Sequence, residues 1–427
     1  MPDRPAGRPG TDAISRTELA SGIRVVTERM PEARSATLGF WVGVGSRDEP
    51  AELAGASHFL EHLLFKGTER RSARDIAEAV DSVGGEMNAF TAKEHTGYWA
   101  RLPAGELGAG LALLSDVLTD PALRPAEVDA ERQVILEELA MDADDPDDLV
   151  HTLLDAALFP DHPLGREVAG DVATITAMRR DDIAGFFERW YRPANLVVAA
   201  AGDLHHADVV DGVAACFAGR DVGVAPERHA PVLDPVPLTV KRTRGEQAHV
   251  AVGWRGVARD DPDRFAVAVL DQVLGGGMAS RMFQEIREDR GLAYSVFSGA
   301  SFHADAGVVS AYVATAPGRS PEALRVLTGI VDDLLADGIT DRELEVARGY
   351  LQGSLVLGLE DSGSRMARLA GYETARRDLV SIDEQVARIG EVTTDDVHRV
   401  VRRVLGGPRS VAAVGPIAAG RLAKLVA

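Results

Sequence analysis

The two halves of the chain resemble each other, and this internal repeat limits the possible folds more than any other pattern. Arg47-Asp48-Glu49-Pro50 is matched by Arg259-Asp260-Asp261-Pro262, an offset of 212 residues from Arg47 to Arg259. Near the end of each half, segment 182–202 resembles segment 396–415 at almost the same offset. A repeat at a near-constant offset predicts two copies of one domain. Strands and helices alternate with hairpin-length turns in each copy, so we expect an α+β fold with two structurally similar α/β domains.

A proline-rich stretch lies between the two copies. Segment 220–239 holds four prolines and shows neither helical nor strand periodicity, which is typical of an interdomain linker. We therefore predict an N-terminal domain over 13–219 and a C-terminal domain over 240–427. The first residues, 1–12, are rich in Pro, Gly and Arg and are expected to form a short disordered tail.

Charge and cysteine content exclude several classes of protein. The 46 Lys and Arg residues are outnumbered by 66 Asp and Glu, giving a net charge of -20, which argues against nucleic acid and anionic membranes as partners. The single cysteine, Cys216, excludes a disulfide scaffold and argues against a cysteine-ligated zinc site. No apolar run approaches the roughly 18 residues of a membrane span, and the N-terminus lacks the apolar core of a signal peptide. A cytoplasmic location is the default expectation.

Residues 58–68, His-Phe-Leu-Glu-His-Leu-Leu-Phe-Lys-Gly-Thr, predict a buried helix with one polar stripe. His58, Glu61 and His62 fall at positions i, i+3 and i+4, on one face of a helix. The remaining positions are apolar, so the helix is hydrophobic nearly all round and is expected to be buried. Buried imidazoles and carboxylates need partners, and a metal ion satisfies all three side chains at once.

The second copy of the repeat lacks this stripe. The offset of 212 residues carries His58, Glu61 and His62 onto Leu270, Val273 and Leu274, which form an ordinary apolar helix face. The departure of the first copy from that pattern favours a functional role for its polar residues. Two histidines four residues apart can share one zinc ion, and a third protein ligand is then needed.

The His-x-x-Glu-His pattern resembles that of the M16 metallopeptidases, the family of pitrilysin, insulinase and mitochondrial processing peptidase. Within that family, the chain is most similar to the short two-domain bacterial members that resemble the processing peptidase. The resemblance covers nearly the whole chain. It implies two similar domains enclosing a chamber, a bound Zn²⁺ ion and hydrolysis of peptide bonds.

The family's third ligand is a glutamate within a later helix, seven residues after another functional glutamate. Glu137 and Glu138 both lie in the corresponding segment. Glu138 shares a helical stripe with Glu131, whereas Glu137 points about 100° away. The resemblance thus implies zinc ligands His58, His62 and Glu138. It also implies Glu61 as general base and Glu131 as the residue that orients a ligand histidine or the reacting water.

Segment 84–91, Gly-Gly-Glu-Met-Asn-Ala-Phe-Thr, resembles the edge strand to which the family's peptide substrates pair. The resemblance places Asn88 and Ala89 next to the scissile bond. An exposed strand edge suits an extended peptide, because backbone pairing gives affinity with little demand on the peptide sequence. Without the His-x-x-Glu-His pattern upstream, an ordinary hairpin with a Gly-Gly turn would be the favoured interpretation of this segment.

The second half carries two further matches to the family. Gly275, Gly276 and Gly277 correspond to a glycine-rich loop that contacts substrate or gates the chamber. Arg287 and Tyr294 correspond to an Arg and Tyr pair that reaches the zinc site, where the Tyr stabilises the oxyanion and the Arg holds the substrate backbone. Considered alone, a helix-surface arginine and a half-buried tyrosine explain the same residues.

These observations predict a zinc-dependent endopeptidase that cuts peptides or unfolded, presequence-like segments. The alternative is a non-catalytic or partner-dependent subunit of a heterodimeric processing peptidase. Because one chain carries both the zinc residues and the glycine-rich loop, we expect a homodimer.

Overall fold

The computed structural model describes residues 13–375 and 379–426, so the expected tail over 1–12 lies outside the described residues. These residues form two compact units. The first unit takes in the described residues up to Ile135, together with Val168–Pro226 and Leu357–Ser381. The second takes in Leu136–Glu167, Glu227–Val356 and the described residues from Ile382 onward. Each unit therefore includes a segment from the other half of the sequence.

The first unit is built on a six-stranded sheet in the order β1-β2-β6-β3-β5-β4. The parallel pair is β2 and β6, and the other neighbours are antiparallel. Every residue of β6 is buried, as its continuous apolar sequence predicts. The strands are β1 (Ile14–Glu18), β2 (Arg24–Arg29), β3 (Ser35–Val42), β4 (Glu86–Thr91), β5 (Thr96–Pro103) and β6 (Leu196–Gly202).

The second unit is built on a five-stranded sheet in the order β7-β11-β8-β10-β9. Here too there is a parallel pair, β7 with β11, among antiparallel neighbours. The strand β7 begins at Leu238, within the last residues of the segment expected as the linker. The strands are β7 (Leu238–Arg242), β8 (Ala248–Gly256), β9 (Ala293–Phe302), β10 (Gly307–Thr315) and β11 (Arg409–Gly415).

The two sheets have the same strand order once β1 is set aside. In chain order, β2 to β6 correspond to β7 to β11, and the parallel pair occupies the same place in both sheets. The predicted α+β fold with two similar domains is therefore confirmed. The apolar helix face predicted in the second copy is also present, since Leu270, Val273 and Leu274 are buried in the core of the second unit.

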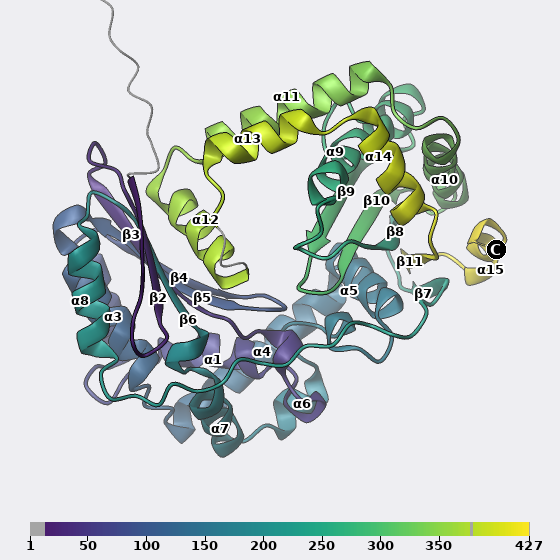
Figure 1. The fold of residues 1–427 in the computed structure, drawn as a ribbon. Coiled ribbons are helices and arrows are strands. Elements are labelled where there is room, and N and C mark those ends of the chain that lie inside the picture. Colours follow the sequence, from purple (N-terminus) through teal and green to yellow (C-terminus); the bar gives the residue numbers. More distant parts are fainter. Residues whose placement is uncertain (1–12, 376–378, 427) are drawn as a thin grey trace, which may run out of the picture. The chain divides into compact units, whose positions relative to one another are not determined.

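Each sheet has one face covered by a helix from the other half of the sequence. In the first unit, α3 (Leu107–Thr119) and α8 (His206–Cys216) lie on one face, and α12 (Ser362–Ala375) lies on the opposite face, against β2, β3 and β6 (Figure 1). In the second unit, α5 (Pro146–Leu158) packs on β8 and β11, opposite α9 (Arg264–Leu274). Each half of the sequence thus contributes one helix, α5 or α12, that covers the sheet of the other half.

The remaining helices complete the two units. Ser72 caps the one that begins at Ala73, since its hydroxyl accepts a hydrogen bond from the Asp75 backbone N–H. They are α1 (Ala56–Leu64), α2 (Ala73–Asp81), α4 (Pro125–Asp144), α6 (Val172–Ala177), α7 (Arg180–Trp190), α10 (Ser320–Asp337), α11 (Asp341–Gly358), α13 (Ile382–Glu391), α14 (Thr394–Val400), α15 (Ala419–Val426) and the π-helical segments Phe283–Asp289 and Val401–Leu405. In the described part of the chain, no helix combines the length and apolarity needed to span a membrane.

Candidate metal centre and substrate edge

Helix α1 is held at its start by a buried carboxylate. Both oxygens of Glu49 accept backbone N–H groups there, from Gly55 at 2.7 Å and from Ser57 at 2.6 Å. Negative charge is favourable at a helix N-terminus. Gly55 adopts a positive φ of 95°, and a side chain there would lie 2.5 Å from the Ala169 carbonyl oxygen. The entry into α1 is therefore fixed in position.

The predicted polar stripe is present on α1. His58, Glu61 and His62 are half-buried, and the two imidazole rings lie 4.7 Å apart between centroids. The other face of the helix is fully buried and consists of Phe59, Leu60, Leu63 and Leu64. Apolar packing on this face points the stripe away from the core.

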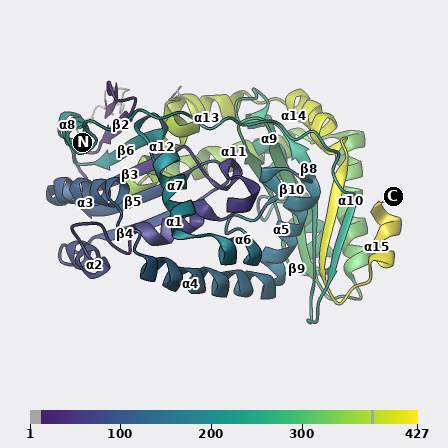
Figure 2. The ribbon, with the colours of Figure 1, turned by 90° about the horizontal axis from the view of Figure 1, so that it is seen from below.

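Helix α4 brings a carboxylate to the two histidines. Donor atoms of His58, His62 and Glu138 all lie within 4.8 Å of one another. The helix runs without interruption from Pro125 to Asp144 (Figure 2), so it fixes Glu138 relative to Glu131. Glu137, the alternative ligand in the sequence, is exposed.

Glu131 lies behind His62 and is only 5% exposed. The His62 Nδ1–H group donates to Glu131 Oε2 at 3.1 Å, and Lys66 Nζ lies 2.7 Å from Glu131 Oε1. A carboxylate in this position fixes the imidazole tautomer and leaves Nε2 for a metal. This is the geometry of a residue that orients a metal ligand.

Glu61 is tied to the edge strand β4. The Thr91 hydroxyl donates to Glu61 Oε2 at 2.6 Å. Nearby, the hydroxyls of Tyr98 and Tyr191 are 2.8 Å apart in the core. Burial raises the pKa of both tyrosines, and the negative charge of Glu61 acts in the same direction. Both tyrosines therefore remain neutral phenols beside Glu61.

The donor set fits a zinc ion. Zinc is commonly held by imidazole nitrogen and carboxylate oxygen, and catalytic zinc sites use three protein ligands. His58, His62 and Glu138 supply that number and those atom types around one point. The hydrogen bond from His62 to Glu131 provides the outer support that such ligands normally have.

Strand β4 lies at the end of the first sheet and pairs with β5 on one side. Among the described residues, no strand pairs with its other side. The Asn88 side-chain oxygen accepts the backbone N–H of Ala89 at 2.8 Å, in an exposed hydrogen bond. The two residues predicted to meet the substrate thus lie on an open strand edge that is suited to pairing with a peptide.

The predicted Arg and Tyr pair lies in the second unit. Arg287 belongs to the π-helical segment Phe283–Asp289, and Tyr294 lies at the start of β9. The guanidinium carbon of Arg287 lies 4.4 Å from the centre of the Tyr294 ring, within cation–π range. Tyr294 is 80% exposed. The structure brings these two side chains together, and their reach toward the zinc residues stays a prediction.

The glycine-rich loop follows α9 in the second unit. A side chain at Gly275 would lie 2.5 Å from the Ser298 nitrogen, and one at Gly276 would lie 2.7 Å from the side chain of Gln272. Gly277 is similarly close to Gln272. The loop therefore packs tightly against its own unit, and a contact with substrate stays a prediction.

Three residues of the site were not assigned from the sequence. Thr91, Lys66 and Glu49 each contact a predicted site residue or the backbone of α1. Lys66 lies four residues after His62, just past the end of α1, so its closeness in sequence is the signal that could have identified it. The partners of Thr91 and Glu49 lie 30 and 8 residues away, respectively, beyond the reach of helical periodicity.

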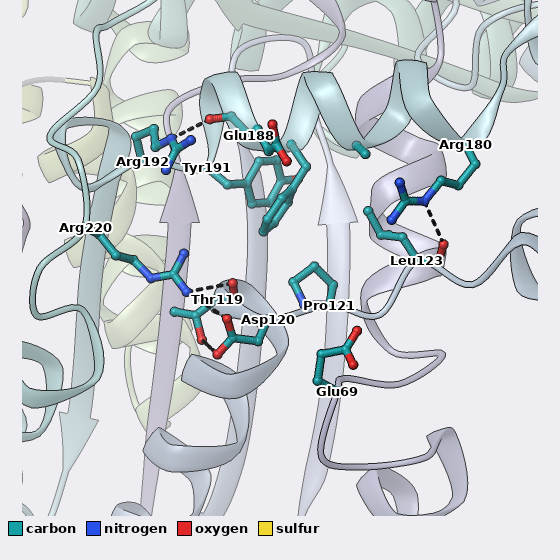
Figure 3. Close-up of a pocket in the computed structure, with 12 residues that line it drawn as sticks. Glu69, Thr119, Asp120, Pro121, Leu123, Arg180, Glu188, Tyr191, Arg192 and Arg220 are labelled. Atoms are coloured by element: carbon teal, nitrogen blue, oxygen red, sulfur yellow. Dashed lines mark hydrogen bonds and ion pairs between the residues drawn. The ribbon is translucent and has the colours of Figure 1, made fainter.

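A separate cavity of about 370 Å³ lies elsewhere in the first unit (Figure 3). Arginines line it, but they bond to oxygens of the same unit. Arg220 donates to the Thr119 carbonyl at 2.7 Å and to Asp120 at 3.1 Å, and Arg180 donates to the Leu123 carbonyl at 3.2 Å. These cations hold the local fold, and the cavity lacks the donor set found between α1 and α4.

Two histidines and a glutamate around one point, beside a further glutamate on the same helix face, have the arrangement of a metalloprotease metal site. Comparison with family models agrees. Residues 24–172 match the model of insulinase (peptidase family M16), and residues 177–351 match the model of the peptidase M16 inactive domain. The chain belongs to the M16 peptidase family.

Similar proteins support this assignment. An uncharacterized zinc protease of Streptomyces coelicolor is 46% identical over 96% of this chain and 91% of its own length. The uncharacterized zinc protease YmxG of Bacillus subtilis is 35% identical over 94% of this chain and 97% of its own length. The crystal structure of a protease from Helicobacter pylori shares the fold, with a TM-score of 0.86 and 22% identity over 94% of this chain and 99% of that one.

Proposed function

We propose that the protein is a zinc-dependent endopeptidase that cleaves extended peptides or unfolded segments. The observation that carries this proposal is the convergence of His58, His62 and Glu138 within 4.8 Å, on the helix that also carries Glu61 and on α4. The proposal draws support from relatives that are named zinc proteases.

The ligands His58, His62 and Glu138 would hold the zinc, and Glu131 would orient His62. Bound there, zinc would supply a Lewis acid that polarises the scissile carbonyl. Glu61 takes the proton of the attacking water and delivers it to the leaving amine. The Thr91 hydroxyl holds one oxygen of Glu61 at 2.6 Å and so limits the orientations of this base.

The open edge of β4 would bind the substrate. An extended peptide pairs with the edge through backbone hydrogen bonds, which demand little of its sequence. The Ala89 backbone N–H donates to the Asn88 side-chain oxygen at 2.8 Å. We expect a carbonyl oxygen of the bound substrate to replace Asn88 as the acceptor. Arg287 and Tyr294 would bind the substrate backbone and the oxyanion, and Gly275, Gly276 and Gly277 would contact the peptide. The working form would be a homodimer.

The second candidate is a subunit that cleaves only with a homologous partner, or that does not cleave. This chain carries all of the proposed zinc ligands together with the proposed general base, which favours a self-sufficient enzyme. Mass measurement of the native protein, with and without a homologous subunit, separates these forms.

The test uses the full chain loaded with one equivalent of zinc and a set of quenched fluorescent peptides. We expect cleavage that is lost on chelation and restored by zinc. Glu61→Gln should bind zinc with unchanged stoichiometry and turn over no peptide. Absence of cleavage by the zinc-loaded protein, both alone and with a homologous subunit, would refute the proposed endopeptidase activity.

A further inference from the structure

The glycine-rich loop of the second unit is anchored where it leaves α9. The backbone N–H groups of Gly275 and Gly276 both donate to the Asp271 carbonyl oxygen, each at 3.0 Å. The Ser298 hydroxyl oxygen lies 3.0 Å from that same carbonyl oxygen and 2.6 Å from Asp271 Oδ1. Contacts from the start of the loop and from strand β9 therefore meet at one residue, Asp271.

Ser298 also sets how closely the loop approaches β9. A side chain added at Gly275 would lie 2.8 Å from both the Cβ atom and the hydroxyl oxygen of Ser298, so the loop backbone and the strand are in direct contact. The hydroxyl donates to a carboxylate, and a hydrogen bond to a charged acceptor is stronger than one between neutral groups. The pair of Asp271 and Ser298 therefore holds the loop against the strand.

The same strand carries Tyr294. Residues 293 and 295 of β9 pair with adjacent residues of β10, so Tyr294 is an extra residue in the strand, which is a β-bulge. Bulges redirect a side chain relative to its neighbours, and Tyr294 is 80% exposed. The contact between Asp271 and Ser298 thus joins the loop to the strand that orients Tyr294. Two features proposed to bind the peptide share one support.

The far end of the loop is held separately. The Arg281 guanidinium donates to both carboxylate oxygens of Glu343, at 2.6 and 3.0 Å, and the Gln284 side-chain amide donates to the Met278 carbonyl oxygen at 2.7 Å. Between the two anchors, the side chains of Met278 and Ala279 are exposed. The loop therefore presents an exposed tip on a backbone that is held at both ends.

We propose that Asp271 and Ser298 are positioning residues, which hold the glycine-rich loop in the conformation that binds the peptide. This inference rests on the proposed function, because it requires a peptide that contacts the loop. A loop that is ordered before the substrate arrives loses less conformational entropy on binding. The pair therefore acts on substrate affinity, so its loss should raise KM and change kcat little.

The experiment separates this contact from general packing. Ser298→Ala removes the donor and Asp271→Ala the acceptor, and each should raise KM for a quenched peptide by about tenfold while kcat stays within about threefold. The double variant should be no worse than either single variant, because both residues act through one contact. Asp271→Asn keeps an oxygen acceptor and should return KM to within about threefold of the wild type. The control is Ser301→Ala, the same change at an exposed position of β9, which should leave KM unchanged.

Two further measurements do not depend on cleavage. Hydrogen exchange of segment 275–279 in the full chain should be at least about fivefold faster in Ser298→Ala, while exchange in β10 stays unchanged, because the loop opens locally. Peptide binding, followed by fluorescence anisotropy in the Glu61→Gln background, should weaken by the same factor as KM rises. Thermal unfolding of each variant shows whether the fold is intact.

Failure of the proposed function is distinguishable from failure of this inference. If the zinc-loaded wild type cleaves nothing, the proposed function fails, and exchange and peptide binding still test the loop. The positioning role is overturned if the wild type binds no peptide, or if Ser298→Ala leaves either the loop exchange or the peptide Kd unchanged. It is also overturned if Ser301→Ala causes the same loss, or if Asp271→Asn loses as much affinity as Asp271→Ala.

Discussion

The Thr91 hydroxyl donates a hydrogen bond of 2.6 Å to Glu61 Oε2. One partner lies on the open strand β4 and the other on helix α1, which carries His58 and His62. The contact therefore joins the surface proposed to bind the peptide with the group proposed to move the proton. Orientation of a base through a second residue is a common requirement of general base catalysis.

Thr91→Val should lower kcat by about ten- to a hundredfold, because a hydrogen bond to a charged group contributes about 1.5–3 kcal/mol. Thr91→Ser retains the hydroxyl and should stay within about threefold of the wild type. Steady-state kinetics with a quenched peptide gives the result, and KM should change little. Equal losses in both variants would show that the hydrogen bond alone does not account for the effect, because Thr91→Ser retains the hydroxyl.

Glu131→Ala should weaken zinc binding by about ten- to a hundredfold, because it removes the acceptor that holds the His62 ring. Competition with a chromophoric chelator measures the zinc affinity. The control is Glu137→Ala, an exposed position on the same helix, which should leave the affinity unchanged. Similar losses at both positions would assign the effect to helix α4 as a whole.

Zinc should raise the melting temperature of the metal-free protein, because an ion that binds only the folded state stabilises it by about 2.7 kcal/mol at a hundredfold excess over Kd. Glu138→Ala should reduce or remove this shift. Magnesium, which prefers six oxygen ligands, should have little effect. Thermal scans with each metal test this, and a shift that survives Glu138→Ala would place the zinc elsewhere.

Asp271→Asn should stabilise the protein near pH 7, and the gain should vanish toward pH 4. Burial raises the pKa of Asp271 above its ordinary value of 3.8, although a hydrogen bond of 2.6 Å from Ser298 opposes this. The folded state thus binds this proton more tightly than the unfolded state, so stability is lost as pH rises through the folded-state pKa. Melting temperatures of both proteins across this range test the sign, and a constant difference would contradict it.

Glu373→Gln should destabilise the first unit by about 2–3 kcal/mol, because it removes the carboxylate that lies 3.4 Å from the buried guanidinium of Arg24. Glu373 on α12 is 1% exposed and accepts two hydrogen bonds from Arg16, at 2.8 and 2.9 Å. The estimate is reduced because Arg16 is partly solvated. Urea unfolding measures the change, and Glu345→Gln, in an exposed pair with Arg342, should change stability by less than about 0.5 kcal/mol.

Local signals in the sequence predicted much of the fold and the grouping of His58, Glu61 and His62, whereas Glu138 was predicted as the third ligand from the resemblance to the M16 metallopeptidases. Helical periodicity placed His58, Glu61 and His62 on one face, and it separated Glu138 from Glu137. The repeat predicted two similar domains, and the two sheets have the same strand order. These inferences depend on spacing along one helix or on the similarity of the halves, both of which can be read from the chain.

Contacts between distant segments could not be predicted in this way. The apolar face of α12 shows that the helix is buried but not which sheet covers it, and Met366 packs against β3 residues more than 300 positions earlier. The boundary between α4, which ends at Asp144, and α5, which begins at Pro146, depends on a local signal instead, because Asp145 caps α5 by accepting the Asp147 N–H at 2.9 Å.

The exchange of α5 and α12 makes the two halves of the chain depend on each other. Without α5, the sheet face that carries Ala251 and Val414 would be open to water, and the first sheet would lose α12 in the same way. Neither half can therefore shelter its own sheet, so separately expressed halves should be insoluble alone and regain solubility when they are produced together.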